Sequence, residues 1–144
     1  MTSCVRQRWG RFLPSPLKRL AGAVLRAYYN MGDCIFCRIV DGTAKADVIF
    51  RDGQVTAFRD IHPAAPKHIL VVPNKHIPSL NDITPADEPI LGHLFSVVKQ
   101  IAEQEGVAAE GYRLIVNTGP YAGQVVWHLH LHILGGGHPH HPMG

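Results

Sequence analysis

The segment from residue 127 to residue 134 constrains the fold more than any other part of this sequence. It alternates histidine with aliphatic residues, so that His128, His130 and His132 are each separated by one apolar side chain. Successive side chains of a β-strand point to opposite faces, which predicts three imidazoles on one face and aliphatic residues in a core. A lone histidine is usually a hydrogen-bonded structural residue. Three on one face favour a metal site, a phosphate site, or nucleophilic and acid–base chemistry near neutral pH.

The remaining patterns predict an α+β domain with a largely antiparallel sheet of about five strands, one long helix and short helical segments. Asp52-Gly53 is typical of a β-hairpin. The expected strands are residues 48–51, 54–60, 68–72, 112–117 and 125–134. The expected helices are residues 35–40, capped by Asp33, and a long one that begins after Thr84 and ends at Gly106. The core stripe expected for the long helix is Ile90, Leu91, Leu94, Phe95, Val98 and Ile101.

Length, cysteine content and charge limit the domain organisation and the partners. A chain of 144 residues suits one domain with a buried core, and three cysteines are too few for a disulfide framework. No run of eighteen apolar residues occurs, so no membrane-spanning helix is expected. Residues 33–144 carry eight basic and eleven acidic side chains, a net charge of −3. This charge argues against a nucleic-acid-binding surface.

Residues 1–31 are expected to form a separate, basic N-terminal extension. They contain six basic side chains and no acidic one, with apolar residues at helical spacing after Ser15. Such a segment is typical of an organellar transit peptide, but also of a plain surface helix or an over-long start that precedes Met31. Reduced thiols and the lack of a secretory signal favour the cytoplasm. Mitochondrial import stays open if residues 1–30 are a transit peptide.

The histidine segment, with Gly135 and Gly136 behind it, resembles the signature of the histidine triad (HIT) superfamily, and in particular its Hint branch, the histidine triad nucleotide-binding proteins. Further family motifs occur in the same order: Cys34-Ile-Phe-Cys37, Ala57-Phe-Arg-Asp60-Ile61, Ala65-Pro-Lys-His68, Pro73-Asn-Lys-His76, Val116-Asn117 and Gly123-Gln124. The likeness covers residues 32–136. It implies the HIT-like fold, with a HIT domain over residues 32–144 that ends in a short tail rich in His, Gly and Pro.

The resemblance implies a hydrolase that cleaves purine nucleotides at the α-phosphate, such as nucleoside 5′-phosphoramidates, through a nucleotidyl-histidine intermediate. His130 is the implied nucleophile, and such a nucleophile splits one difficult displacement into two easier ones. His132 and His68 are expected around the phosphate, and His128 completes the implied catalytic set. Taken alone, His68 has an equally good structural explanation at the start of an apolar strand. No cofactor is required for this chemistry.

The same resemblance implies a nucleotide-binding set around the histidines. Asn117 and Gln124 are expected to donate hydrogen bonds to phosphate oxygens, and Asp60 is expected to accept them from the ribose hydroxyls. Phe36 and Ile61 are expected to enclose the base. Without the resemblance, Asp60 would be interpreted as a turn residue and Phe36 as a core residue. Asn117 and Gln124 flank a glycine-rich loop, in which turn formation is an adequate explanation.

Val125 departs from the family pattern, because many Hint proteins carry Ser or Thr directly after the Gly-Gln pair. A hydroxyl there can bond the phosphate or help to protonate the leaving group. Its absence keeps a second class of function open, a nucleotide-binding regulatory or interaction protein with weak catalysis. Dinucleoside polyphosphate hydrolysis is a further alternative, against which Gly135 and Gly136 argue.

Cys34 and Cys37 form a thiol pair at metal-ligand spacing. By resemblance to zinc-binding HIT proteins, His76 and His128 complete a closed, structural Cys₂His₂ zinc site. A redox pair is the first alternative, although the thioredoxin-like βαβ setting is missing. Two cysteines without a ligand are the second.

The resemblance also implies purine nucleotide ligands and a homodimer, with the long helix and a central strand at the interface. An apolar helix stripe serves a monomer core equally well. His62 and His93 match no functional position and are interpreted as surface or helix residues. His138, His140 and His141 form a tail that is interpreted as a mobile C-terminus.

Overall fold

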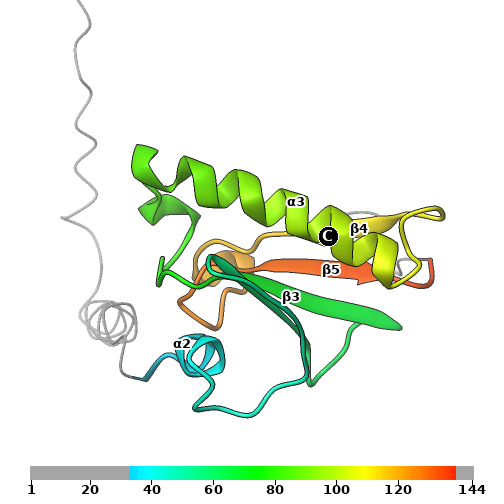
Figure 1. The fold of residues 1–144 in the computed structure, drawn as a ribbon, viewed down its shortest axis with the longest axis horizontal. Coiled ribbons are helices and arrows are strands. Elements are labelled where there is room, and N and C mark those ends of the chain that lie inside the picture. Colours follow the sequence, from blue (N-terminus) through cyan, green and yellow to red (C-terminus); the bar gives the residue numbers. More distant parts are fainter. Residues whose placement is uncertain (1–32, 139–144) are drawn as a thin grey trace, which may run out of the picture.

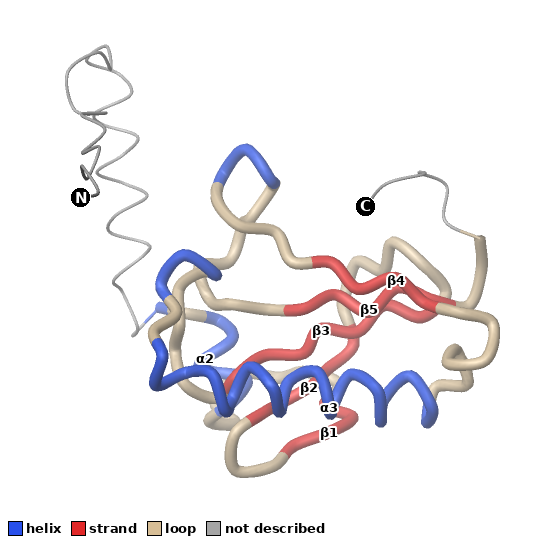
Figure 2. Tube along the Cα trace, turned by 90° about the horizontal axis from the view of Figure 1, so that it is seen from above, coloured by secondary structure: helices blue, strands red, loops and turns tan. Residues whose placement is uncertain are grey.

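The structure, a computed structural model, describes residues 33–138 of the chain. One antiparallel sheet forms its centre, with the strands in the order β1-β2-β3-β5-β4. α3 lies along one side of this sheet and α2 on the opposite side (Figure 1). The strands lie side by side, and α3 runs in roughly the same direction as they do (Figure 2). The predicted α+β architecture is confirmed. The elements are α2 (Ile35–Val40), β1 (Val48–Arg51), β2 (Val55–Arg59), β3 (Lys67–Pro73), η2 (Leu80–Asp82), η3 (Pro85–Asp87), α3 (Glu88–Gln104), β4 (Tyr112–Ile115), η4 (Pro120–Ala122) and β5 (Leu131–Gly135).

Two predicted segments lie outside the described residues. These are the N-terminal extension over residues 1–31 and the part of the C-terminal tail that holds His140 and His141.

Alternating side chains give the sheet two packed faces. Ile69 and Ile133 belong to the buried cluster that packs against α3. Leu70, one residue further along β3, belongs to the cluster that contains Phe36 of α2. His132 is the cross-strand partner of Leu70, and such partners share a face. The alternation in the sequence therefore predicted correctly that His132 and the aliphatic residues beside it face opposite ways.

α3 shows both the expected ends and an error in its expected core face. Thr84 precedes the helix as expected and forms a capping box with Asp87, although the first turn is the 3-10 helix η3. Gly106 follows the helix at φ +74°, the left-handed conformation that glycine adopts most easily. Phe95, expected in the core, is 59% exposed, because a rotation of about 100° per residue separates it from the buried Leu94.

Among the described residues, no helix has the length and apolar composition needed to cross a membrane.

Several strand ends differ from the prediction by one or two residues, and two further differences lie beside the histidines. Cys34, and not Asp33, is the N-cap of α2, where its sulfur accepts the N–H of Cys37 at 3.5 Å. The last strand, expected over residues 125–134, spans only Leu131–Gly135.

Pro73 explains why β5 begins late. The β3–β5 ladder reaches Val71 opposite Leu131, and the next position would need a donor from Pro73, which has no N–H. Leu129 instead donates its N–H to the carbonyl of Ile77 at 2.7 Å. His128 and His130 therefore precede the strand and are not held by the ladder.

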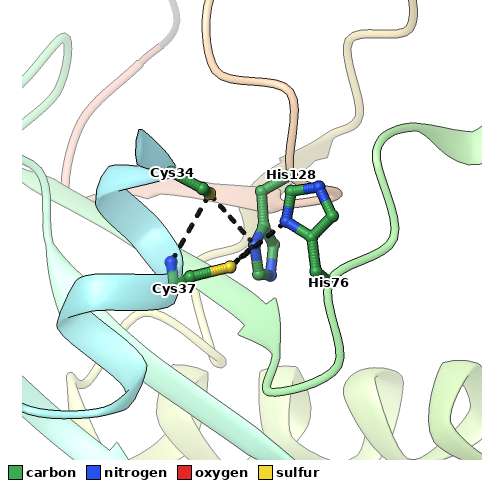
Figure 3. Close-up of side chains that lie close together, drawn as sticks. All are labelled: Cys34, Cys37, His76 and His128. Carbon is green, nitrogen blue, oxygen red and sulfur yellow. Dashed lines mark hydrogen bonds between the residues drawn. The ribbon is translucent and has the colours of Figure 1, made fainter. Parts of the chain in front are cut away.

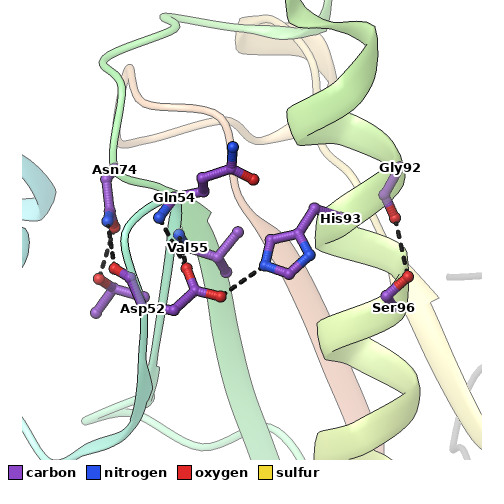
Figure 4. A network of polar contacts seen from close by, with 8 residues as sticks. Asp52, Gln54, Val55, Asn74, Gly92, His93 and Ser96 are labelled. Carbon is purple, nitrogen blue, oxygen red and sulfur yellow. Dashed lines mark hydrogen bonds and ion pairs between the residues drawn. The ribbon is translucent and has the colours of Figure 1, made fainter.

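The predicted hairpin at Asp52-Gly53 is confirmed, and it is tied to α3. One oxygen of Asp52 accepts the N–H groups of Gln54 and Val55 at 2.8 and 2.7 Å. The other lies 2.6 Å from Nε2 of His93 on α3 (Figure 4). Both members of this pair are partly exposed, so it contributes about 0–1 kcal/mol to stability. His93 is thus a helix residue with a structural contact, as expected.

Gly135 and Gly136 lie where side chains would collide with neighbouring segments. A Cβ on Gly135 would lie 2.9 Å from Cγ1 of Val107, and one on Gly136 would lie 3.2 Å from Cβ of Pro66. Gly136 also has φ +83°. The glycine pair lets β5 leave the sheet against these two segments.

Gly135→Ala is expected to lower the free energy of unfolding by about 1–3 kcal/mol through overpacking. Adding Val107→Ala should recover part of this loss, because it removes the atoms that collide. Gly92→Ala in α3 is the matched control, since nothing lies within 4 Å of the added Cβ; it should raise stability by about 0.5–1 kcal/mol. Urea unfolding followed by circular dichroism measures all three. A Gly135→Ala protein as stable as the wild type would contradict this packing.

Candidate active site

Three imidazoles meet beside α2, at the junction of β3 and β5. The ring centroids of His130 and His132 are 4.9 Å apart, and those of His68 and His132 are 5.2 Å apart. His68 comes from β3, His132 from β5, and His130 from the residue before β5. His128 lies at the far end of the group, fully buried. The structure thus brings together the four histidines that the sequence selected.

Main-chain groups fix the hydrogen positions of His68 and His132. The N–H of Ala64 donates to Nδ1 of His68 at 3.0 Å, so the single hydrogen of neutral His68 sits on Nε2. That Nε2–H donates to Nδ1 of His132 at 2.9 Å. The hydrogen of His132 therefore sits on its own Nε2, which is buried and has no hydrogen-bond partner among the described residues. The pair presents one unused donor.

His130 has the opposite tautomer. Its Nδ1 lies 2.6 Å from the carbonyl oxygen of His128, and a carbonyl only accepts, so Nδ1 carries the hydrogen. Nε2 of His130 is left with a free lone pair. The edge of the Phe36 ring packs against this imidazole, with centroids 5.1 Å apart and planes at 85°. Phe36 is buried and also packs against Phe58.

Burial keeps these imidazoles uncharged. It lowers the pKa of His68 and of His130 below the usual 6.5. Burial, together with the neighbouring imidazoles, lowers the pKa of His132 to about 4. An uncharged imidazole is the form that can attack as a nucleophile or bind a metal. The cluster is therefore ready for such chemistry at neutral pH.

A second group of side chains lies around His128 (Figure 3). Nε2 of His128 donates to the carbonyl of Pro73 at 2.7 Å, which turns its Nδ1 lone pair toward Cys34 and Cys37, each 3.5 Å away. Nδ1 of His76 lies 3.2 Å from the sulfur of Cys37. These two sulfurs and two nitrogens all lie within 4.8 Å of one another. We call them the Cys₂His₂ cluster.

The protonation of the Cys₂His₂ cluster suits metal binding. Burial lowers the pKa of His128 to about 4, so its ring is uncharged and free to coordinate. Burial and the neighbouring Cys34 raise the pKa of Cys37 to about 12. Without a cation, then, the Cys37 thiol keeps its proton, whereas a bound metal would displace it. Two thiols and two imidazoles match the donor set of structural zinc.

The residues expected to contact the nucleotide differ in their exposure and in how many hydrogen bonds they already make within the protein. Asp60 accepts the N–H of His62 at 2.7 Å through one oxygen, and the other oxygen lies 3.4 Å from Nε2 of His68. Ile61, which follows it, is 83% exposed. Asp60 thus makes the turn contact that the sequence suggested and also borders the histidines.

Gln124 is buried and its amide is already engaged by the loop. Its NH₂ group donates to the carbonyls of Pro78 and Val126 at 2.8 and 3.1 Å, and its oxygen accepts the N–H of Gly119 at 2.9 Å. The side chain thereby closes the loop that precedes the histidines. Asn117 lies half-buried before this loop, and Val125 is exposed after it.

Sequence reasoning missed the main-chain partners of the imidazoles. The carbonyls of Pro73 and His128 and the N–H of Ala64 decide which ring nitrogen carries the hydrogen. Backbone groups carry no residue-type signature, so no motif could reveal them. Pro73 alone offered a signal, because a proline at the end of a strand often ends its ladder.

Known proteins resemble this chain in sequence and in fold. A model of the HIT domain matches residues 41–139, which include all four clustered histidines. The purine nucleoside phosphoramidase of Escherichia coli (strain K12) is 49% identical over 104 residues, spanning 72% of this chain and 87% of that protein. The crystal structure of a HIT family hydrolase from Legionella pneumophila Philadelphia 1 has a TM-score of 0.75 at 43% identity, covering 78% of this chain and 100% of that one. The histidine triad nucleotide-binding protein from Candida albicans has a TM-score of 0.65 at 29% identity, covering 78% and 87%.

The depressed pKa of His132 predicts how stability responds to acid. Below pH 6.5 the unfolded chain protonates this residue, whereas the folded protein does not until about pH 4. The free energy of unfolding should therefore fall as the pH drops through this window. His132→Gln should make the fall shallower, because glutamine does not titrate in this range. Urea unfolding between pH 7 and pH 4 measures this; equal slopes for wild type and His132→Gln would refute the assignment.

Proposed function

Because the chain belongs to the HIT domain family, we propose that this HIT-family hydrolase cleaves purine nucleoside 5′-phosphoramidates at the α-phosphate, with His130 as the nucleophile. The name of the Escherichia coli relative, purine nucleoside phosphoramidase, supports the substrate class. The observation that carries the proposal is the tautomer of His130. Its Nδ1–H is held by the carbonyl of His128 at 2.6 Å, which leaves Nε2 as a free nucleophile in an apolar setting.

In the first step Nε2 of His130 attacks the α-phosphorus and forms a P–N bond as the bond to the leaving amine breaks. The product is a nucleotidyl-histidine. The carbonyl of His128 accepts from Nδ1–H throughout and stabilises the positive charge that develops on the ring. Burial, which lowers the pKa of His130, supplies the neutral imidazole that the attack requires.

His132 is the proposed donor to the phosphate. Its Nε2–H is buried and has no hydrogen-bond partner within residues 33–138, so a phosphate oxygen would satisfy it. The hydrogen bond from such a donor becomes stronger as negative charge grows on the phosphate oxygen in the transition state. His68 holds His132 in this tautomer through the 2.9 Å hydrogen bond to Nδ1. His68 therefore acts as a positioning residue.

In the second step water attacks the phosphorus of the nucleotidyl-histidine and the P–N bond breaks. The nucleoside monophosphate and neutral His130 are released, and one proton of the water goes to solvent. The leaving amine of the first step needs a proton. We assign this proton to solvent, because Val125 has no hydroxyl and is 85% exposed. Loss of the hydroxyl that many Hint proteins carry is expected to slow the first step.

The nucleotide is proposed to lie between Asp60, Ile61 and Phe36. One oxygen of Asp60 faces His68 at 3.4 Å, which suits a carboxylate that accepts from the ribose hydroxyls beside the phosphate site. Ile61 is exposed and Phe36 lies against His130, so the two offer apolar surface to a base. Asn117 is proposed to donate to the phosphate. We assign Gln124 an indirect part, through the loop that its amide closes.

Zinc is proposed to occupy the Cys₂His₂ cluster. The fit rests on the Nδ1 lone pair of His128, which its hydrogen bond to Pro73 directs at the two sulfurs. Cys34, Cys37, His76 and His128 would supply all four ligands of a closed tetrahedral site. The metal would cross-link α2 to the segment before β5 and would leave no open position for substrate. Its contribution is therefore structural.

A homodimer is also proposed, with α3 and, in place of the expected central strand, the edge strand β4 at the interface. β4 is an edge strand of the described sheet, and exposed edges favour pairing with another chain. Phe95 on α3 is 59% exposed and Tyr112 on β4 is 38% exposed.

We propose the cytoplasm as the compartment. We also propose a HIT domain over residues 32–144, preceded by a separate basic extension over residues 1–31.

His130→Ala is expected to reduce turnover of adenosine 5′-phosphoramidate by about three orders of magnitude or more, because it removes the proposed nucleophile, whereas Nδ1 of His132 accepts from His68 and Nε2 of His132 carries a hydrogen. Release of adenosine monophosphate, measured by chromatography, follows the reaction. His62→Ala is the matched control and should retain wild-type turnover. Full activity in His130→Ala would exclude this nucleophile. A wild type that binds adenosine monophosphate without turnover would favour the regulatory alternative, for which Val125 is the supporting feature.

A further inference from the structure

We propose that His128 is a positioning residue which joins the Cys₂His₂ cluster to the nucleophile, so that a metal held by its side chain orients His130 through its main-chain carbonyl. The inference rests on the proposed hydrolase function and on the fit of zinc to the cluster. It extends the structural role of the metal to the chemical step.

His130 needs such support because the hydrogen-bond ladder between β3 and β5 ends before it. His130 is the last residue before β5, which begins at Leu131. Sheet hydrogen bonds therefore do not hold the stretch from His128 to His130, although this stretch carries the nucleophile. A nucleophile that is poorly oriented loses much of the rate that positioning provides. Contacts outside the sheet must supply the missing support.

His128 supplies the first of these contacts, through both its side chain and its main-chain carbonyl. Its side chain is fully buried, with Nε2 bonded to the carbonyl of Pro73 and Nδ1 facing Cys34 and Cys37. Its carbonyl, in the same residue, accepts from Nδ1 of His130 at 2.6 Å. A shift of the His128 backbone would break the bond that fixes the tautomer of His130.

A second contact runs through the neighbouring segment. Leu129 donates its N–H to the carbonyl of Ile77 at 2.7 Å, and the residue before Ile77 is His76, whose Nδ1 faces Cys37 at 3.2 Å. Both segments that hold the nucleophile are therefore attached to the same cluster.

A third contact comes from α2. Phe36 lies between Cys34 and Cys37 in the chain, and its ring packs edge-on against both His128 and His130, with centroids 6.0 and 5.1 Å apart. Without a cation, the four donor groups meet through weak sulfur contacts of 3.2–3.5 Å and through an edge contact between the rings of His76 and His128. Four metal–ligand bonds would fix α2, His76 and His128 together, and with them the walls around His130.

Linkage gives a test that does not depend on turnover. If zinc orders the nucleotide site, a nucleotide must hold zinc more tightly by the same factor. The full-length, zinc-loaded protein is mixed with a chromogenic zinc chelator, with and without saturating adenosine monophosphate. At equilibrium with the chelator, we expect the nucleotide to tighten zinc binding by about fivefold or more. Inorganic phosphate at the same concentration controls for zinc binding by the ligand itself.

A variant separates orientation from folding. His76→Ala removes one ligand and an edge contact with the His128 ring, but keeps both hydrogen bonds of His128. It should lower kcat about tenfold or more, while KM rises only by the roughly fivefold factor that the linkage with zinc requires. His93→Ala, a histidine that contacts the β1–β2 turn, is the control and should keep wild-type kcat. Zinc binding that the nucleotide does not tighten, or a His76→Ala protein that loses zinc yet keeps its kcat, would overturn the inference. A protein that takes up no zinc would overturn it too, while leaving the hydrolase proposal intact. Loss of adenosine monophosphate binding and turnover in the wild type would instead refute the proposed function.

Discussion

Buried, uncharged imidazoles set the main constraint on this structure. Such a ring has one N–H to donate and one lone pair to be approached, and leaving either unsatisfied away from water costs about 1–3 kcal/mol. Here main-chain groups make the choice for each ring: Pro73 for His128, His128 for His130, and Ala64 for His68. The tautomer of His132 then follows from that of His68. Two nitrogens of these four rings are left without a partner among the described residues: Nε2 of His130, which carries a lone pair, and Nε2 of His132, which carries a hydrogen to donate.

The way the sheet ends makes this arrangement possible. Pairing of β3 with β5 brings His68 and His132 together. Pro73 then stops the ladder, and its carbonyl, free of a strand partner at this point, accepts from His128 instead. The chain before β5 can therefore turn its imidazoles toward α2 and toward one another. A longer strand would have fixed all three rings in parallel at strand spacing, about 6.6–7 Å apart, whereas the rings of His130 and His132 are 4.9 Å apart.

Much of this could be predicted from residue types alone. Alternation placed His132 opposite its aliphatic neighbours, Asp52-Gly53 marked the hairpin, and Thr84 with Asp87 marked the start of the long helix. Periodicity failed for Phe95, because a helical repeat shows which residues are apolar and not which of them the sheet covers. The alternating pattern also predicted a last strand that is too long at its start. Pro73, which ends the pairing, lies on a partner strand nearly sixty residues away, so the pattern within the last strand could not show its effect. The tautomers lay beyond any pattern, since backbone groups determine them.

Main-chain groups determine the tautomers of His68, His128 and His130, and the proposed role of His130 as nucleophile depends on this assignment. Two-dimensional ¹H–¹⁵N correlation of the histidine side chains near neutral pH is the decisive measurement, because the nitrogen shifts report which ring atom carries the hydrogen. We expect a hydrogen on Nδ1 in His130, and on Nε2 in His68, His128 and His132. A hydrogen on Nε2 of His130, or rapid exchange between its two tautomers, would exclude the proposed nucleophile.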